Sequence, residues 1–231
     1  MRRYKRTIQR IANIKGFCLL FITFLSFLPS LLSAGELDEI VSSLQKTYKD
    51  IDAISAEFIA ETSSKSLGNK ISADGTVYFK KPGMMRWEYS TPPGDLIISD
   101  GRIVWFYQSD LNQVIESAVN RDARTISQNF LAGIGSLRDD FEIIREESRT
   151  EIYRLKLSPK IQQPGVDRLY IDVDKENFIV KGTTVIDPYG NETTVTFKKI
   201  KINRPIRDSL FRFTPPEGTS VVRPRQLTID D

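Results

Sequence analysis

The chain has 231 residues, of which 40% are hydrophobic and 27% are charged, a composition typical of a globular protein. Its formal net charge of +3 depends on six basic residues within the first fifteen positions; without these six, 27 basic residues stand against 30 acidic ones, a net charge of −3. The basic balance therefore gives no reason to expect nucleic acid as a partner.

The first 35 residues have the layout of a cleaved secretory signal. A basic segment over residues 1–15 precedes an apolar run over 16–32, and Ser33, Ala34 and Gly35 supply small residues for cleavage. A permanent membrane anchor is the alternative, because this apolar run is just long enough to span a bilayer. Pro29 and the small residues favour cleavage, so we expect a single mature domain over 36–231.

Two residue types that carry much enzyme chemistry are missing. The chain has no histidine, and its single cysteine, Cys18, lies inside the apolar run. A mature chain would therefore lack disulfides, a thiol nucleophile, the usual general base and the usual zinc ligands. Asp172 and Asp174 lack the spacing of a calcium-binding loop, and Ser99 falls at an expected turn. We expect no catalytic residue, no metal site and no cofactor; an enzyme is the alternative that these absences disfavour.

The predicted elements begin with a helix and a strand. Apolar residues at helical spacing predict an amphipathic helix over 37–51, and period-two alternation predicts a first strand over 54–61. The stretch 75–107 then contains three turn signals between strands rich in large apolar residues. Its last part, 103–107, is apolar on both faces, which implies that something covers each face.

Further strands follow, interrupted by one short helix. Spaced apolar residues predict a glycine-broken helix over 126–137. The remaining predicted strands are 113–117, 141–145, 152–157, 167–173, 178–186, 193–202 and 211–216. About ten or eleven strands in a meander should curl toward a barrel, because closure removes exposed edges. A curled sheet that is incompletely filled and closed by helices would hold an apolar pocket.

These features, in this order, resemble the LolA type of periplasmic outer-membrane lipoprotein carrier. The resemblance rests on the strand ISAEF, the sequence VYFKKPGMMRWEY, the hairpin ISDGRIVWFY and the terminal FRFTPPEG, and it covers roughly residues 36–220. It implies a mainly β (α+β) fold: an incomplete antiparallel β-barrel of about 11 strands, with a helical lid over a hydrophobic cavity.

The resemblance also suggests candidate site residues. Those expected on the strands of an acyl-chain cavity are Phe58, Val77, Phe79, Met85, Trp87, Ile98 and Phe106, and those expected in the lid are Ile126, Phe130, Leu131 and Ile134. The basic residue before Pro82 is Lys81, where the family often has arginine. The resemblance implies that Lys81 helps to hold the lid closed, with a point charge in place of the planar fork of arginine.

Family members accept triacylated lipoproteins from an inner-membrane ABC-type lipoprotein-releasing complex and pass them to an outer-membrane lipoprotein receptor. The resemblance therefore implies a periplasmic, monomeric carrier without a cofactor. The receptor is itself a lipoprotein, so the lack of a cysteine after Ala34 favours the soluble carrier. A periplasmic lipid or glycolipid carrier or sensor of the same fold, with different cargo, is the alternative.

Overall fold

A computed structural model describes residues 30–66, 68–119, 137–146, 150–162 and 165–224 of the protein. The chain divides into two compact units, Met1–Val41 and Ser42–Asp231. The division falls inside helix α2 (Ser30–Lys49), whose N-terminal portion is the described part of the first unit. In the described ranges, no helix is long and apolar enough to cross a membrane.

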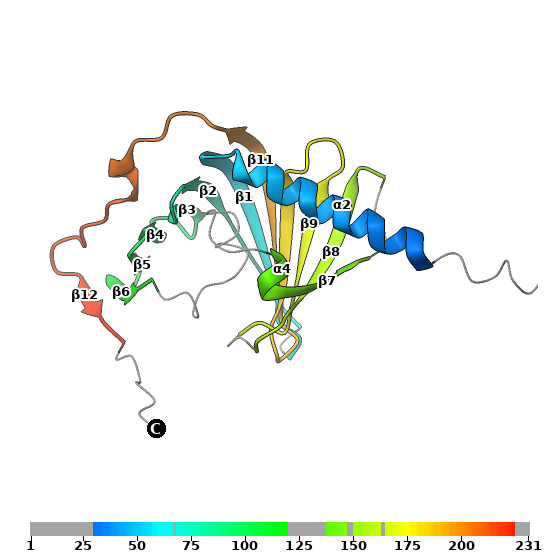
Figure 1. The fold of residues 1–231 in the computed structure, drawn as a ribbon. Coiled ribbons are helices and arrows are strands. Elements are labelled where there is room, and N and C mark those ends of the chain that lie inside the picture. Colours follow the sequence, from blue (N-terminus) through cyan, green and yellow to red (C-terminus); the bar gives the residue numbers. More distant parts are fainter. Residues whose placement is uncertain (1–29, 67, 120–136, 147–149, 163–164, 225–231) are drawn as a thin grey trace, which may run out of the picture. The chain divides into compact units, whose positions relative to one another are not determined.

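A sheet of twelve strands dominates the second unit (Figure 1). The strand order is β12-β6-β5-β4-β3-β2-β1-β11-β10-β9-β8-β7, and neighbours pair antiparallel except for β12 and β6, which are parallel. The strands are β1 Ala53–Ser63, β2 Lys70–Lys80, β3 Met84–Thr91, β4 Leu96–Asp100, β5 Ile103–Gln108, β6 Gln113–Ala118, β7 Phe141–Arg145, β8 Ile152–Pro159, β9 Arg168–Asp174, β10 Val180–Ile186, β11 Glu192–Ile202 and β12 Ser220–Val222.

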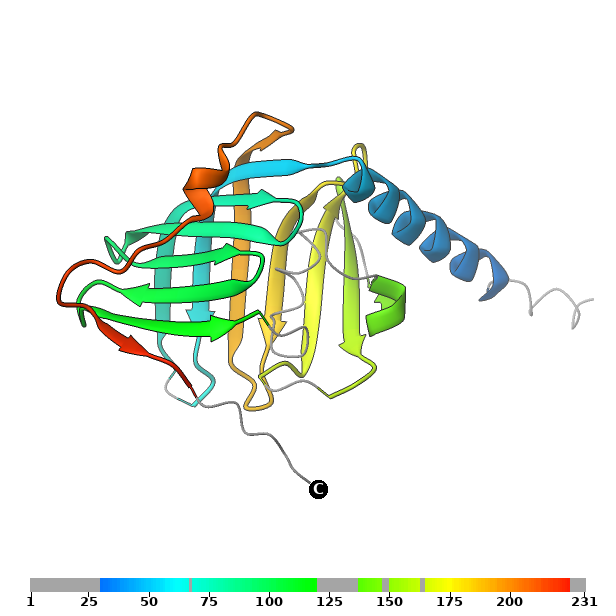
Figure 2. The same ribbon diagram turned by 60° about the vertical axis from the view of Figure 1, so that its left-hand side comes forward.

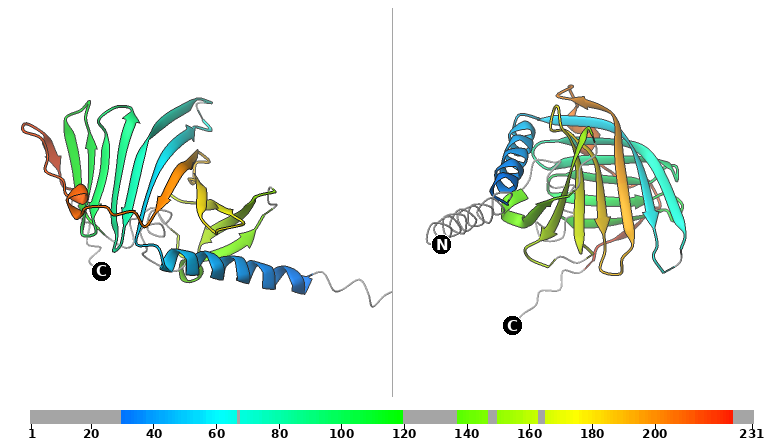
Figure 3. Two further views of the ribbon diagram at one scale, coloured as in Figure 1. Left: turned by 90° about the horizontal axis from the view of Figure 1, so that it is seen from above. Right: turned by 90° about the vertical axis from the view of Figure 1, so that its right-hand side faces the viewer.

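The sheet curls strongly without closing. Strands β3–β6 cross strands β8–β10 at a steep angle (Figures 2 and 3). The two edge strands, β7 and β12, stand at opposite ends of the strand order. The predicted incomplete antiparallel barrel is thus confirmed, with twelve strands instead of about eleven and one parallel pair at its edge.

The helices differ from their predicted bounds. Helix α2 begins at Ser30, seven residues before the predicted start, and ends at Lys49. Its buried residues are those of the predicted apolar stripe, with Leu44 and Tyr48 in the second unit. The predicted signal segment and the helix at 126–137 fall almost wholly outside the described residues; Leu137 begins the single-turn helix α4 (Leu137–Asp140).

Each face of the sheet carries one of the two tryptophans. Residues directly opposite one another on paired strands project from the same face. Trp87 lies opposite Val77 on β2 and Ile97 on β4, whereas Trp105 lies opposite Ile98 on β4. Because Ile97 and Ile98 are adjacent in the strand, the two tryptophans point to opposite sides. We call these sides the Trp87 face and the Trp105 face.

The Trp105 face carries a separate apolar core beneath the C-terminal segment, residues 203–224. Ile98, Trp105 and Val114 are buried there, and Phe213 from the segment packs on them. The ring centroid of Phe213 lies 6.2 Å from that of Trp105 and 5.7 Å from that of Tyr107. The expectation that residues 103–107 are covered on this face is confirmed.

The predicted last strand at 211–216 is wrong. The structure has a 3-10 helix, η2 (Asp208–Phe211), and its last strand is β12. Pro215 and Pro216 have no N–H to donate to a ladder, so the large apolar residues before them dock on the sheet instead of pairing with it.

Side chains of the sheet hold the C-terminal segment in place. Lys80 Nζ donates to the carbonyl of Ile206 (2.7 Å) and lies 2.6 Å from Asp208 Oδ1. Arg86 donates to the carbonyl of Leu210 (3.2 Å). The segment (orange to red in Figure 2) then reaches the edge of the sheet, where β12 pairs with β6.

Candidate functional site: an apolar pocket

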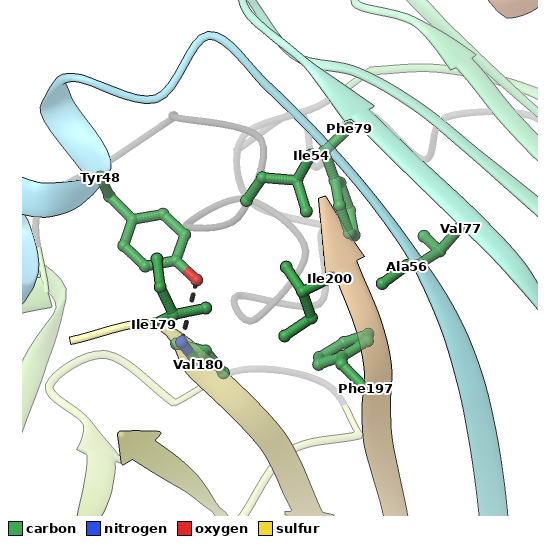
Figure 4. Close-up of a pocket in the computed structure, with 9 residues that line it drawn as sticks. All are labelled: Tyr48, Ile54, Ala56, Val77, Phe79, Ile179, Val180, Phe197 and Ile200. Carbon is green, nitrogen blue, oxygen red and sulfur yellow. Dashed lines mark hydrogen bonds between the residues drawn. The ribbon is translucent and has the colours of Figure 1, made fainter. Parts of the chain in front are cut away.

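An apolar pocket lies between the end of α2 and the Trp87 face of the sheet (Figure 4). It encloses about 260 Å³, including the part open to solvent. All of its lining residues belong to the second unit: Tyr48, Ile54, Ala56, Val77, Phe79, Ile179, Val180, Phe197 and Ile200. Eight of these nine side chains are hydrocarbon, so the pocket favours an apolar occupant.

The one polar side-chain group of this lining already has a partner. The hydroxyl oxygen of Tyr48 accepts a hydrogen bond from the backbone N–H of Val180 at 3.1 Å (Figure 4). A register irregularity between Val180 and Gly182 releases this N–H from the ladder. Burial raises the pKa of Tyr48 above its ordinary value, so the phenol is neutral at physiological pH.

A bulge in β11 brings two further residues to the pocket. The pairing of β1 with β11 shifts between Ser55 and Glu57, and Lys199 has a φ of +49°. Strict alternation would place Phe197 and Ile200 on opposite faces, because they are three residues apart. The extra residue in the bulge puts both of them on the Trp87 face.

A cluster of aromatic rings continues the Trp87 face beside the pocket. The ring of Trp87 lies edge-on to Phe58 and Phe79, with centroid distances of 4.8 and 5.9 Å, and its centroid lies 6.2 Å from that of Phe197. Edge-on aromatic contacts add stabilisation beyond the buried area. Phe79 and Phe197 also line the pocket, so cluster and pocket share a wall.

Six of the seven predicted cavity residues on strands share this face. Val77 and Phe79 line the pocket. The other four are Phe58, Met85 and Trp87, which are buried, and Phe106, which is partly exposed and lies opposite Ile97. The structure therefore brings these six residues together on one surface, although only two of them contact the pocket.

Ile98 does not join them. Its register partner is Trp105, and its buried side chain belongs to the core of the Trp105 face. The prediction that Ile98 lines the cavity is therefore wrong. Apolarity alone cannot distinguish Ile97 from Ile98; the register of β3 with β4 decides which of the two lies on the Trp87 face.

Lys81 caps the C-terminal end of helix α2. Its Nζ donates to the carbonyl oxygens of Tyr48 (2.7 Å) and Lys49 (2.8 Å), the last two residues of α2. A cation at a helix C-terminus is stabilised by the helix dipole and satisfies orphan carbonyls. The expected lid residues, Ile126, Phe130, Leu131 and Ile134, lie outside the described residues, so the expected contact of Lys81 with a lid stays a prediction.

Sequence reasoning missed seven of the nine lining residues. Ile54, Ala56 and Phe58 are spaced two residues apart and so lie on one face of β1. The period-two pattern was therefore a signal for Ile54 and Ala56. Tyr48 continues the apolar stripe of the helix. The remaining four, Ile179, Val180, Phe197 and Ile200, reach the pocket at strand irregularities, for which the sequence carries no clear signal.

The acidic residues weighed as calcium ligands lie close to basic side chains instead. Asp172 Oδ1 is 3.7 Å from Arg154 Nε, and Asp174 Oδ2 is 3.2 Å from Lys181 Nζ. In the part of the chain that the structure describes, no group of three or more His, Cys, Asp or Glu residues is placed to hold a metal ion.

Known proteins resemble this chain in sequence and in fold. The model of the family described as "Outer membrane lipoprotein carrier protein LolA" matches residues 49–214. Proteins named outer-membrane lipoprotein carrier protein from Nitrosomonas europaea and Nitrosospira multiformis are 30% and 27% identical to this chain; the alignments cover 89% of this chain and 98% and 96% of the relatives.

The crystal structure of an uncharacterized conserved protein from Thermus thermophilus has the same fold, with a TM-score of 0.51 and 15% identity over 82% of this chain and 99% of that one. The family match extends from the end of α2, across the pocket-bearing sheet, to the C-terminal segment. The chain therefore belongs to the LolA family of outer membrane lipoprotein carrier proteins.

Proposed function

We propose that this protein is a periplasmic carrier that binds the acyl chains of lipoproteins, and that it is not an enzyme. The observation that carries the proposal is the apolar pocket on the Trp87 face, whose only polar side-chain group is already hydrogen-bonded. An acyl chain can be buried in such a site, but the lining residues supply no group that could react with it. The family membership and the names of the relatives support the same role.

The size of the pocket sets a condition on loading. The roughly 260 Å³ of the pocket includes space that is open to solvent, so its enclosed part is smaller than this volume. One myristoyl-length chain exceeds this capacity, and a triacylated lipoprotein carries three chains. Loading must therefore widen the pocket, and the energy needed to separate its walls opposes binding.

This opposition suits a carrier that must also release its cargo. Each buried methylene contributes about 0.8 kcal/mol, so three fully buried long chains would contribute more than about 30 kcal/mol. That value exceeds the practical limit of noncovalent affinity, about 20 kcal/mol. Incomplete burial and a closed empty state would keep the affinity low enough for transfer.

We further propose the route of the cargo. The protein would be secreted by a signal over residues 1–35, accept triacylated lipoproteins from the inner-membrane ABC-type complex and deliver them to the outer-membrane receptor as a monomer. Cell fractionation tests the location, and N-terminal sequencing of the periplasmic form tests the cleavage. A chain that stays with the inner membrane would contradict the secretion step.

Photocrosslinking to a lipoprotein donor tests the pocket. Phe197→Gln places an amide in the apolar wall, where burying it without a partner should lower loading about tenfold. Tyr189→Gln is the matched control, because Tyr189 is 84% exposed and lies away from this lining. Circular dichroism must show that both variants keep the sheet. Normal loading of a folded Phe197→Gln protein would mean that the acyl chains bind elsewhere.

Native mass spectrometry of protein purified from the periplasm identifies the cargo class. A bound lipoprotein supports the proposal. A bound free lipid or glycolipid, with no lipoprotein in any preparation, would instead favour the alternative carrier or sensor with the same fold.

A further inference from the structure

The indole of Trp87 carries an unused hydrogen-bond donor. Trp87 is only 6% exposed, and its Nε1 is buried without a hydrogen-bond partner anywhere in the described structure. Buried polar groups normally have partners, and leaving one unpaired costs free energy. The second tryptophan differs, since Trp105 Nε1 donates to Glu116 Oε2 at 3.3 Å.

The surroundings of Trp87 limit what could pair with this donor. Its ring packs against Phe58, Phe79 and Phe197, which offer hydrocarbon contacts, and two of these rings line the pocket. The hydroxyl of Tyr48, on the lining of the pocket, already accepts a hydrogen bond from the N–H of Val180. An occupant of the pocket would supply the partner that the described residues do not provide.

The chemistry of the donor selects the class of that partner. An indole N–H donates and does not accept, so a purely hydrocarbon chain leaves it unpaired. A carboxylate would bring a charge into an apolar site, where no cation stands among the described lining residues to balance it. A neutral carbonyl oxygen satisfies the N–H without this cost. In an acylated molecule, carbonyl oxygens occur where the chains join the head, as esters or an amide.

We propose that Trp87 Nε1 donates a hydrogen bond to an acyl carbonyl oxygen of the bound lipid. Trp87 then recognises the linkage of the cargo as well as its hydrocarbon, and the N–H that has no partner among the described residues gains one on loading. This inference rests on the proposed carrier function, because it requires an acyl chain in the pocket. It adds a specificity-determining residue, which buried area alone would not identify.

The test compares lipids that differ only in their linkage. The probes are a tripalmitoylated cysteine peptide, an analogue with its two glyceryl esters replaced by ethers, and an analogue whose third chain is also attached through an ether in place of the amide. We expect the unmodified protein to bind the ester form about tenfold more tightly than the ether forms, the value of one hydrogen bond that would otherwise leave a donor unpaired. A loss that appears only when the amide is removed identifies the amide carbonyl as the acceptor.

Two tryptophan variants provide the matched comparison. Trp87→Phe keeps an aromatic ring but removes the N–H, so its preference between the linkages should disappear. Trp105→Phe removes an N–H from the opposite face and should keep the full preference. If the ratio of the affinities for the ester and ether probes is the same in the unmodified and Trp87→Phe proteins, the role of Trp87 is overturned while the carrier function stands. Failure of the unmodified protein to bind any of the probes would overturn the carrier function with it.

A second measurement leaves Trp87 intact. In the Trp105→Phe protein, Trp87 supplies the only indole N–H signal in a proton–nitrogen correlation spectrum. Binding of the ester peptide should move this signal downfield, as expected for a newly formed hydrogen bond, whereas the analogue without any acyl carbonyl should not. A signal that moves equally with both probes would overturn the inference, even if the Trp87→Phe variant is too unstable to study.

Discussion

Gly75 shows how one residue without a side chain allows the aromatic cluster to form. It stands opposite Phe58 on β1 and Tyr89 on β3. A Cβ atom at this position would lie 1.9 Å from the carbonyl oxygen of Glu88 and 2.9 Å from the ring of Phe58. Glycine is therefore required here, because the neighbouring backbone and ring occupy the space that a side chain would need.

Replacing this glycine should be costly. Gly75→Ala forces the backbone of β3 or the ring of Phe58 to move, and we expect it to lower the free energy of unfolding by about 3 kcal/mol. Gly182→Ala is the matched control on another strand, where the added methyl would lie 3.0 Å from the carbonyl oxygen of Val195. Its free energy of unfolding should fall by a smaller amount. Urea unfolding measures both variants. Equal losses would show that the packing around Phe58 is not what requires glycine.

At the scale of single elements, the end of helix α2 depends on the hairpin after β2. Lys81 is held at the start of that turn, where its backbone N–H donates to the carbonyl of Asp52. From there its ammonium group reaches the last two carbonyls of the helix. The helix therefore ends at a position that the sheet specifies, next to the pocket residue Tyr48.

Removing this cap should loosen the last helical turn. Lys81→Leu abolishes both hydrogen bonds, and we expect amides of residues 46–49 to exchange about fivefold faster, equivalent to about 1 kcal/mol. Lys81→Arg keeps the charge and its donors, and should exchange like the parent protein. If the lysine also controls cargo release, transfer of a lipoprotein to an acceptor should fall more than loading. If the Lys81→Leu protein shows unchanged amide exchange and unchanged cargo release, Lys81 neither stabilises the end of α2 nor controls release.

The C-terminal segment is a second element whose position depends on charge. Arg223 Nε lies 2.8 Å from Glu116 Oε1, and this hydrogen bond holds the pKa of Glu116 below its ordinary value of 4.5. A carboxylate with a lowered pKa in the folded state stabilises that state above the ordinary value and loses its contribution as pH falls through the lowered pKa.

Acid should therefore loosen β12 before the rest of the sheet unfolds. Fluorescence of Trp105, measured in a Trp87→Phe protein, should change as pH falls below 4.5, because Trp105 Nε1 also donates to Glu116. In a Glu116→Gln protein the same step should be absent. A fluorescence step of equal size in the glutamine variant would assign the transition to another carboxyl group.

For the molecule as a whole, one sheet serves two different purposes on its two faces. The Trp105 face is covered by the protein's own C-terminal segment, through Phe213. The Trp87 face carries the pocket and the indole N–H that lacks a partner in the part of the chain that the structure describes. The core on one side would hold the strands together if the other side opens, as the proposed function requires.

If loading widens the pocket, its closing hydrogen bond should weaken. The N–H of Val180 is protected in the empty protein by its bond to the hydroxyl of Tyr48. We expect hydrogen exchange at this amide to accelerate when a triacylated peptide binds, while amides between β8 and β9, which lie in the regular ladder, keep their protection. Equal or greater protection of Val180 in the loaded protein would mean that the chains enter without separating α2 from the sheet.

Much of the fold follows from local patterns in the sequence. Period-two alternation and the turn residues predicted most of the strands from β1 to β11 with small errors at their ends, because both signals act within a few residues; β2 is the exception, since it begins at Lys70 and the predicted stretch began at residue 75. The doubly apolar stretch at 103–107 also predicted correctly that the Trp105 face would be covered, since Phe213 packs there. The six cavity candidates that share the Trp87 face came from the family resemblance, and the alternation of the strands is consistent with their common side.

What the sequence by itself determined was therefore the strands, their turns and the family resemblance; the tertiary structure decided which side chains meet. A shift of one residue in register exchanges the two faces of a strand, which is why Ile98 was placed wrongly. The bulge at Lys199 brings Phe197 and Ile200 to one face against the alternation. Such contacts depend on pairing between segments distant in the sequence, and no local pattern encodes them.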